Sequence, residues 1–173
     1  NAHNSIAIAI LSAGIGNRIK SYEPRSLLKI GNKALIEHQI SVINNSFQFP
    51  EIIGVFGYSI DKVIKKIRGQ IRIIENQLYQ DTNTAESLRL AFNSTTKESL
   101  LFLHGDLYFN LKTLQNLDYS KSFLLMDTKN SLNDKEVGVT VCDNKATILS
   151  YGLPIKWCQI AYITGREYKI LRH

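Results

Sequence analysis

The segment LSAGIGNR, residues 11–18, has the composition of a loop that binds phosphate. Its small residues let backbone N–H groups approach an anion closely, and Arg18 adds a fixed positive charge. The loop lacks the Gly-Lys-Ser/Thr ending of a Walker loop and the third glycine of the dinucleotide-binding pattern. A plain turn is therefore the alternative. If the loop binds nucleotide, the contacts are expected at Leu11, Ala13, Gly14, Gly16 and Asn17.

Asp106 follows the apolar run SLLFLH, residues 99–104, with only Gly105 between them. A carboxylate beside a buried strand is costly unless it serves as a cap or a ligand. Magnesium prefers oxygen donors and needs only one or two protein carboxylates when nucleotide phosphates complete its shell. We therefore predict that Asp106 is a Mg²⁺ ligand and that Gly105 lies against the nucleotide. The alternative role for Asp106 is the N-cap or turn residue of the next helix. His104 is expected to be a packed residue rather than a base.

Four uncharged polar residues lie close together in the sequence and could form a pocket for a base and a ribose. Amides and hydroxyls can recognise donor and acceptor edges without adding charge. These residues are Asn76, Thr82, Asn83 and Ser87. Helix capping is the alternative, and it is strong for Asn83 and Ser87.

Aromatic residues raise a weaker hypothesis, that a cage in the acceptor site favours a quaternary ammonium group. The candidates are Tyr79, Tyr108, Tyr151 and Trp157. Simple core packing is the more common role of such residues.

Residues with these roles must be positioned by regular elements, and the sequence alternates apolar β-type runs with segments of helical period. Strands are predicted at 6–11, 51–57, 71–75 and from 99, with helices at 34–45, 59–68, after Asn83 and near 111–117. This alternation predicts an α/β protein with a parallel sheet, whose ligands bind at the carboxyl ends of the strands. Three further β-type runs, 123–126, 137–142 and 147–150, lack intervening helices. They predict an antiparallel extension, so the sheet is mixed and mostly parallel.

Residues 11–40 together resemble the signature of the nucleotidyltransferases that activate sugar phosphates and phosphocholine. The shared features are the GxGxR loop, a Pro followed by a basic residue, two leucines, and a Leu-Ile-Glu helix. The similarity continues in order through GVFGY at 54–58, ENQLYQDTNTAESL at 75–88, LHGDLYF at 103–109 and MDTK at 126–129. It covers most of the chain and thins after about residue 150. Phosphocholine cytidylyltransferase-like members are the most similar, because of the Tyr79, Thr82, Asn83 and Ser87 spacing.

This resemblance implies a three-layer α/β/α, Rossmann-like nucleotide-diphospho-sugar transferase fold. It also implies transfer of a nucleotidyl group from a nucleoside triphosphate, CTP as the first expectation, to a small phosphorylated acceptor. The acceptor would be a phosphocholine-like alcohol phosphate or a sugar 1-phosphate, and pyrophosphate would be released. Catalysis would consist of alignment and charge neutralisation. Loop amides would hold the triphosphate, Arg18 would neutralise the departing pyrophosphate, and Arg25 would contact the reacting phosphates. The cofactor would be Mg²⁺.

The sequence departs from the family pattern in three places. Arg25 stands where the family has a lysine, which retains the charge and changes the geometry. Tyr151 stands near the position of a second family lysine, and KWCQIAYI at 156–163 replaces a segment that has an acidic residue before its strand. The family's second acidic metal ligand is expected in a segment beyond His173, with Asp127 or Asp143 as substitutes. Residues 1–173 are thus expected to form a single domain without the family's C-terminal segment. The alternative function is a catalytically incomplete nucleotide-binding module that acts through interaction.

Composition limits the remaining classes. The 173 residues carry 21 Lys and Arg against 15 Asp and Glu, a net charge of +6 that suits an anionic ligand. The basic residues are scattered and not interleaved with aromatics, so a nucleic-acid partner is not expected. The apolar run 6–11 is far shorter than the ~18 residues of a membrane span, and no membrane partner is expected. Cys142 and Cys158 have no zinc or disulfide spacing, which favours a cytoplasmic location.

Overall fold

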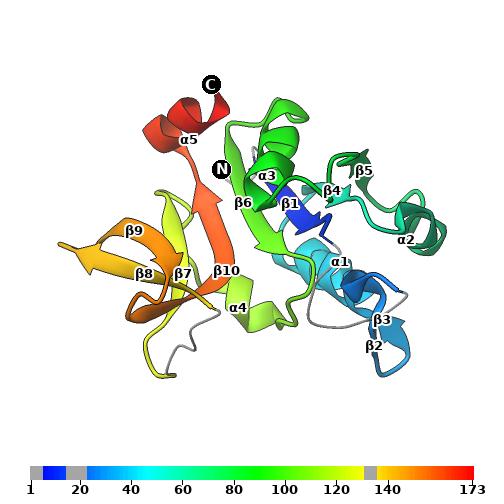
Figure 1. Ribbon diagram of the computed structural model, residues 1–173, viewed down its shortest axis with the longest axis horizontal. Helices are drawn as coiled ribbons and strands as arrows, with labels where there is room; N and C mark the ends of the chain where they lie inside the picture. Colours follow the sequence, from blue (N-terminus) through cyan, green and yellow to red (C-terminus); the bar gives the residue numbers. More distant parts are fainter. Residues whose placement is uncertain (1–5, 15–22, 131–135) are drawn as a thin grey trace.

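A mixed β-sheet runs through the centre of the molecule. The computed structural model describes residues 6–14, 23–130 and 136–173. The sheet has the strand order β5-β4-β1-β6-β10-β8-β9, with β7 paired to β10 (Figure 1). Its strands are β1 (Ile6–Ser12), β4 (Glu51–Phe56), β5 (Arg72–Glu75), β6 (Ser99–His104), β7 (Phe123–Asp127), β8 (Val137–Cys142), β9 (Lys145–Tyr151) and β10 (Ile155–Ile163). A separate two-stranded sheet consists of β2 (Lys29–Ile30) and β3 (Lys33–Ala34).

The sheet contains a parallel part and an antiparallel part, as predicted. Strands β5, β4, β1 and β6 run parallel to one another. Strand β10 runs antiparallel to β6, β7 and β8, and β8 and β9 form an antiparallel hairpin. Because β1 lies between β4 and β6, successive strands are added on opposite sides of it, which makes its carboxyl end a topological switch point.

Helices cover both faces of the parallel part, which gives the predicted three layers (Figure 1). They are α1 (Leu35–Ser46), α2 (Ile60–Ile67), α3 (Thr84–Asn93), α4 (Leu111–Gln115) and α5 (Gly165–Arg172), with a 3-10 helix at Arg25–Leu27. Residues 6–10 of β1 alternate isoleucine with alanine. Its isoleucines pack with residues of α1, α2 and α4, while Ala7 and Ala9 pack with residues of α3 and α5. Every residue from Ile6 to Leu11 is buried, as expected of a central strand.

The sequence did not predict strand β10 and helix α5, nor the short strands β2 and β3 and the 3-10 helix at Arg25–Leu27. Residues 160–163 of β10 are buried and pair with β6, so this strand joins the two parts of the sheet. A change of register between Trp157 and Ala161, with Gln159 at a φ of 61°, interrupts its alternation. Helix α5 carries only one buried residue, Tyr168, so its apolar stripe is weak in the sequence.

Candidate functional site

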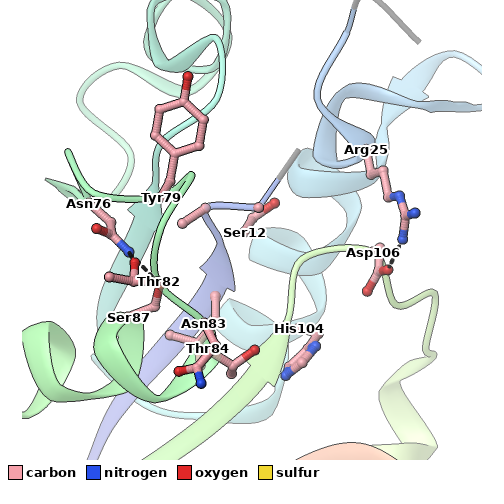
Figure 2. Close-up of a pocket in the computed structure, with 13 residues that line it drawn as sticks. Ser12, Arg25, Asn76, Tyr79, Thr82, Asn83, Thr84, Ser87, His104 and Asp106 are labelled. Atoms are coloured by element: carbon pink, nitrogen blue, oxygen red, sulfur yellow. Dashed lines mark hydrogen bonds and ion pairs between the residues drawn. The ribbon is translucent and has the colours of Figure 1, made fainter. Parts of the chain in front are cut away.

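A cleft opens at the carboxyl ends of the parallel strands. It has a volume of about 260 Å³ and is lined by segments that follow β1, β5 and β6, together with Arg25 and the start of α3 (Figure 2). This is the edge at which an open α/β sheet binds its ligands. The lining residues are Leu11, Ser12, Ala13, Gly14, Arg25, Asn76, Tyr79, Thr82, Asn83, Thr84, Ser87, His104 and Asp106.

One side of the cleft holds a network of uncharged polar groups centred on Asn76. The Asn76 amide nitrogen donates to the hydroxyls of Thr82 at 3.0 Å and Ser87 at 3.3 Å, and its oxygen accepts the N–H of Leu78 at 3.1 Å. Asn76 is almost fully buried, and its backbone N–H bonds to Phe56 on β4. The side chain thus fixes the segment that leads from β5 to α3, and the outward surface of that segment faces the cleft.

Asn83 has the capping role that the sequence left open for it, whereas Ser87 has a packing role inside α3 and is not its cap. The Asn83 side chain accepts the N–H of Ala85 at 2.9 Å and caps α3. Ser87 is buried on the first turn of α3 and accepts from Asn76. Both residues nevertheless line the cleft, so capping and nucleotide binding are compatible here. Their contacts with a base or ribose remain a prediction.

The opposite side of the cleft is charged (Figure 2). The Arg25 guanidinium donates to a carboxylate oxygen of Asp106 at 2.9 Å, and both side chains are about one third exposed or less. A cation suited to phosphates and a carboxylate suited to a metal ion therefore lie in contact. The two residues come from distant segments, the 3-10 helix before β2 and the turn after β6.

Close packing fixes the turn that carries Asp106 against the end of β1. The N–H of Gly105 bonds to the carbonyl of Leu11 at 2.9 Å. A Cβ at position 105 would come within 2.5 Å of the Ser12 Cβ, a distance that requires one of the two to move. The glycine therefore allows a close approach of two backbones, with no need of an unusual φ.

His104 lies between the two sides of the cleft, at the end of β6. Its ring packs edge-on against Trp157 of β10, with the centroids 5.7 Å apart. Burial lowers the pKa of His104, and the nearby Asp106 charge partly opposes that shift. Its Nε2 is buried and has no hydrogen-bond partner among the described residues. An unsatisfied imidazole nitrogen at a cleft wall is a group that a bound ligand can satisfy.

Most of the residues predicted for the site meet at this cleft. Gly105 supports it through its contacts with β1, while Gly16, Asn17 and Arg18 lie outside the described residues. The predicted site residues that line the cleft are Leu11, Ala13, Gly14, Arg25, Asn76, Thr82, Asn83, Ser87 and Asp106. Their individual roles remain predictions.

Ser12, Thr84 and His104 line the cleft although the sequence did not place them in the site, and Tyr79 was predicted for a different role. Ser12 and Thr84 each adjoin a predicted site residue, and this adjacency was the available signal. Of the four aromatic residues proposed for a cage, only Tyr79 lines the cleft. Trp157 packs on Phe102 and His104, Tyr108 stacks on His38, and Tyr151 is largely exposed on β9; these are packing or surface positions.

The substitute metal ligands lie away from the cleft. Asp127, at the end of β7, accepts hydrogen bonds from the N–H groups of Lys129 and Asn130, and Asp143 lies at a φ of 50° in the β8–β9 turn. Within residues 6–14, 23–130 and 136–173, no group of three or more His, Cys, Asp or Glu side chains is arranged around a common metal position. In the same ranges every helix is too short or too polar to cross a bilayer.

The fold and the position of the cleft can be compared with known proteins. A family model described as a MobA-like NTP transferase domain matches residues 8–117, which include most of β1, the segment after β5, and the turn after β6. The chain belongs to this family. The matched range contains every residue that lines the cleft of this NTP transferase domain.

Curated relatives include two bacterial proteins named bifunctional protein GlmU. The one from Blochmanniella pennsylvanica is 34% identical over 149 residues, which are 82% of this chain and 32% of the relative. The one from Acaryochloris marina is 34% identical over 103 residues, which are 58% of this chain and 22% of the relative. The NTP transferase domain described here thus spans a fifth to a third of these relatives.

Solved structures share the fold. The CTP:phosphocholine cytidylyltransferase LicC from Streptococcus pneumoniae superposes with a TM-score of 0.72 at 22% identity, over 96% of this chain and 75% of LicC. The inositol-1-phosphate CTP transferase from T. maritima gives a TM-score of 0.69 at 19% identity, over 96% of this chain and 73% of that one. The likeness confirms the predicted nucleotide-diphospho-sugar transferase type of fold.

Proposed function

We propose that this chain is a nucleotidyltransferase that binds a nucleoside triphosphate in the cleft and transfers its nucleotidyl group to a small phosphorylated acceptor. A phosphate oxygen of the acceptor attacks the α-phosphorus. The bond between the α-phosphorus and the bridging oxygen breaks, and pyrophosphate leaves with the bonding electron pair. The observation that carries the proposal is the division of the cleft into an uncharged hydrogen-bonding side and a charged side. That division suits a nucleoside at one end and reacting phosphates at the other.

On the uncharged side, the segment fixed by Asn76 would bind the base and ribose. Thr82, Asn83 and Thr84 present hydroxyl and amide groups to the cleft, and Tyr79 adds an aromatic face. Such groups can distinguish bases by their donor and acceptor edges. CTP is the first candidate, and the cytidylyltransferases among the structural neighbours favour it.

On the charged side, Arg25 would hold phosphate oxygens and neutralise charge as the α-phosphorus reacts. A guanidinium grips two oxygens in a plane, so its geometry at the phosphates differs from that of the family's lysine. The loop amides and Arg18, predicted from the sequence, would contribute to the same task. A sugar 1-phosphate and a phosphocholine-like alcohol phosphate both remain candidate acceptors, because the proposed aromatic cage is not assembled in the cleft.

The charged side also fits a magnesium ion carried by the triphosphate. Asp106 offers a single, partly exposed carboxylate, and a metal bound chiefly by phosphate oxygens needs only one or two. Asp106 would hold the ion, whose chemistry is the withdrawal of negative charge from the phosphates. A preformed metal site is not supported, because Arg25 already pairs with Asp106.

Pyrophosphate release tests this function. The purified protein is incubated with Mg²⁺, each of the common nucleoside triphosphates in turn, and candidate phosphorylated alcohols and sugar 1-phosphates. We expect release with one pair and its loss in Asp106→Asn, which keeps the side-chain volume and removes the charge. No release from any pair by the folded protein would refute the proposed activity.

The Arg25–Asp106 contact favours one second candidate, a nucleotide-binding module without turnover, because it occupies the only carboxylate in the cleft lining given above. Calorimetric titration with CTP separates the two functions. CTP binding that Mg²⁺ does not enhance and Asp106→Ala does not change would favour the module. Metal-dependent binding that is lost in Asp106→Ala would favour the enzyme.

A further inference from the structure

The turn that carries Asp106 is held from a second side by helix α1. The amide nitrogen of Gln39 donates to the carbonyl of His104 at 3.1 Å and to that of Leu107 at 2.7 Å. These carbonyls flank Asp106 on either side in the chain. One residue earlier on α1, the ring Nε2 of His38 bonds to the carbonyl of Phe109 at 2.8 Å. The turn is therefore clamped between β1, through Gly105, and α1.

Gln39 occupies a position on α1 that helical periodicity assigns to the core. Ile36, Gln39, Ile40 and Ile43 follow the spacing i, i+3, i+4, i+7, which places them on one face of the helix. The three isoleucines are buried. Gln39 itself has no exposed surface. A polar residue in this stripe is unusual, because the other three members are isoleucines that pack into the core.

Stability alone does not account for this buried amide. Both neighbouring groups are carbonyl oxygens, so only the nitrogen end of the side chain can face them. The Gln39 oxygen is left buried without a partner among the described residues. A buried acceptor without a partner costs about as much free energy as one or two hydrogen bonds contribute. The two hydrogen bonds thus add little net stability, and what they supply is a fixed position for the turn.

We propose that Gln39 is a positioning residue that holds the Asp106 carboxylate where a divalent ion bound to the nucleotide meets it. The inference rests on the proposed function. Gln39 is not among the residues that line the cleft, and it acts through the two backbone carbonyls beside Asp106. Groups that orient a metal ligand in this way commonly change metal affinity by about tenfold when they are removed.

The test uses Mn²⁺ as a spectroscopic probe for the divalent ion and CTP as the nucleotide, with the whole chain. Gln39→Met keeps nearly the same side-chain volume and removes both donors. Ile43→Val is the matched control, because it perturbs a buried residue one turn along the same helix whose apolar side chain donates no hydrogen bond to the Asp106 turn. Electron paramagnetic resonance measures Mn²⁺ binding in the presence of CTP, calorimetry measures CTP binding without metal, and thermal unfolding measures stability.

We expect Gln39→Met to weaken Mn²⁺ binding by about tenfold and to leave metal-free CTP binding within about twofold of wild type. Ile43→Val should lower the unfolding temperature without changing either affinity. Equal Mn²⁺ affinity in Gln39→Met and wild type would overturn the inference, as would a parallel loss of both affinities, which indicates general damage. If Gln39→Met does not fold, Gln39→Asn replaces it, since the shorter amide cannot reach both carbonyls, and the same outcomes apply.

The two proposals fail in different ways. If the wild-type protein binds no Mn²⁺ with CTP or with any other nucleoside triphosphate, the proposed function is wrong, and the role of Gln39 falls with it. If the wild type binds Mn²⁺ together with a nucleoside triphosphate, and Gln39→Met binds Mn²⁺ equally well, only the proposed role of Gln39 is wrong.

Discussion

Replacing Arg25 by glutamine should change metal binding in opposite directions with and without nucleotide. In the free protein Arg25 holds Asp106 at 2.9 Å, so a divalent ion that approaches the carboxylate must compete with the guanidinium. Under the proposed function, Arg25 would have phosphate oxygens as partners when a triphosphate is bound, and its positive charge would then help to bind the complex of metal and nucleotide. Without nucleotide, Arg25→Gln removes the competitor of the metal ion for Asp106. With nucleotide, it removes a positive charge that would help to bind the phosphates.

The magnitude follows from the exposure of the pair. Two unit charges at about 4 Å attract by roughly 1 kcal/mol in water and roughly 4 kcal/mol near a protein surface. The Arg25 and Asp106 side chains are 27% and 34% exposed. For ion pairs that are partly exposed, the net stabilisation falls to about 1 kcal/mol once the costs of desolvation and of ordering the side chains are included. Removing the pair should therefore strengthen binding of Mn²⁺ alone by about fivefold. Loss of a charged hydrogen bond to phosphate, roughly 1.5–3 kcal/mol, should weaken nucleotide binding by about tenfold or more.

Electron paramagnetic resonance titration of Mn²⁺, with and without CTP, measures both effects. Arg25→Lys is the control, because it keeps the charge and should resemble wild type more closely in both conditions. If Arg25→Gln binds Mn²⁺ alone no more tightly than wild type, the pair does not restrain Asp106. If its CTP binding is also unchanged, Arg25 does not contact phosphate.

Three further outcomes follow from the structure. Gly105→Ala should destabilise the protein by roughly 1–3 kcal/mol, because the added methyl collides with Ser12. Gly14→Ala, with open space around its Cβ, should leave the free energy of unfolding nearly unchanged. Denaturant titration compares the two variants, and equal stability would contradict the close packing at Gly105. Asn83→Ala should cost about 1 kcal/mol of stability through loss of the α3 cap, and an unchanged unfolding midpoint would show that the cap is dispensable. The backbone N–H of Ala34 lowers the pKa of Glu37 below the ordinary value of a glutamate, so the ionised side chain stabilises the fold above that ordinary pKa. This contribution is lost as the pH falls through the lowered pKa. The stability of Glu37→Gln should therefore vary less than that of wild type over acidic pH, and parallel curves would refute the assignment.

The parallel half of the fold could be predicted because its signals are local. Residues 6–11 form an uninterrupted apolar run, and the helical stripe of α1 is regular. Strand β10 escaped prediction because its pairing partners are distant in sequence and the irregularity near Gln159 breaks its alternation. The antiparallel runs before it were recognisable from their β-type composition alone.

The site was predictable where a residue's type and its place after a strand were enough. Asn76 follows β5 directly and Asp106 follows β6 after Gly105, so the topology brings them to one edge of the sheet. The contact between Arg25 and Asp106 depends on how the segment before α1 folds over the sheet, which no local pattern specifies. Gln39 carried a signal that periodicity alone could have provided, a polar residue in an apolar stripe, but its role depends on the turn that it meets.

The central claim is that the cleft transfers a nucleotidyl group. The most direct measurement follows a nucleoside triphosphate labelled at its α-phosphate, beginning with CTP, in the presence of Mg²⁺ and the candidate phosphorylated acceptors. We expect the label to appear in a product with a new diphosphate bond to the acceptor, together with an equimolar amount of unlabelled pyrophosphate. Transfer of the γ-phosphate instead, or the absence of any labelled product from the folded wild-type protein, would contradict it.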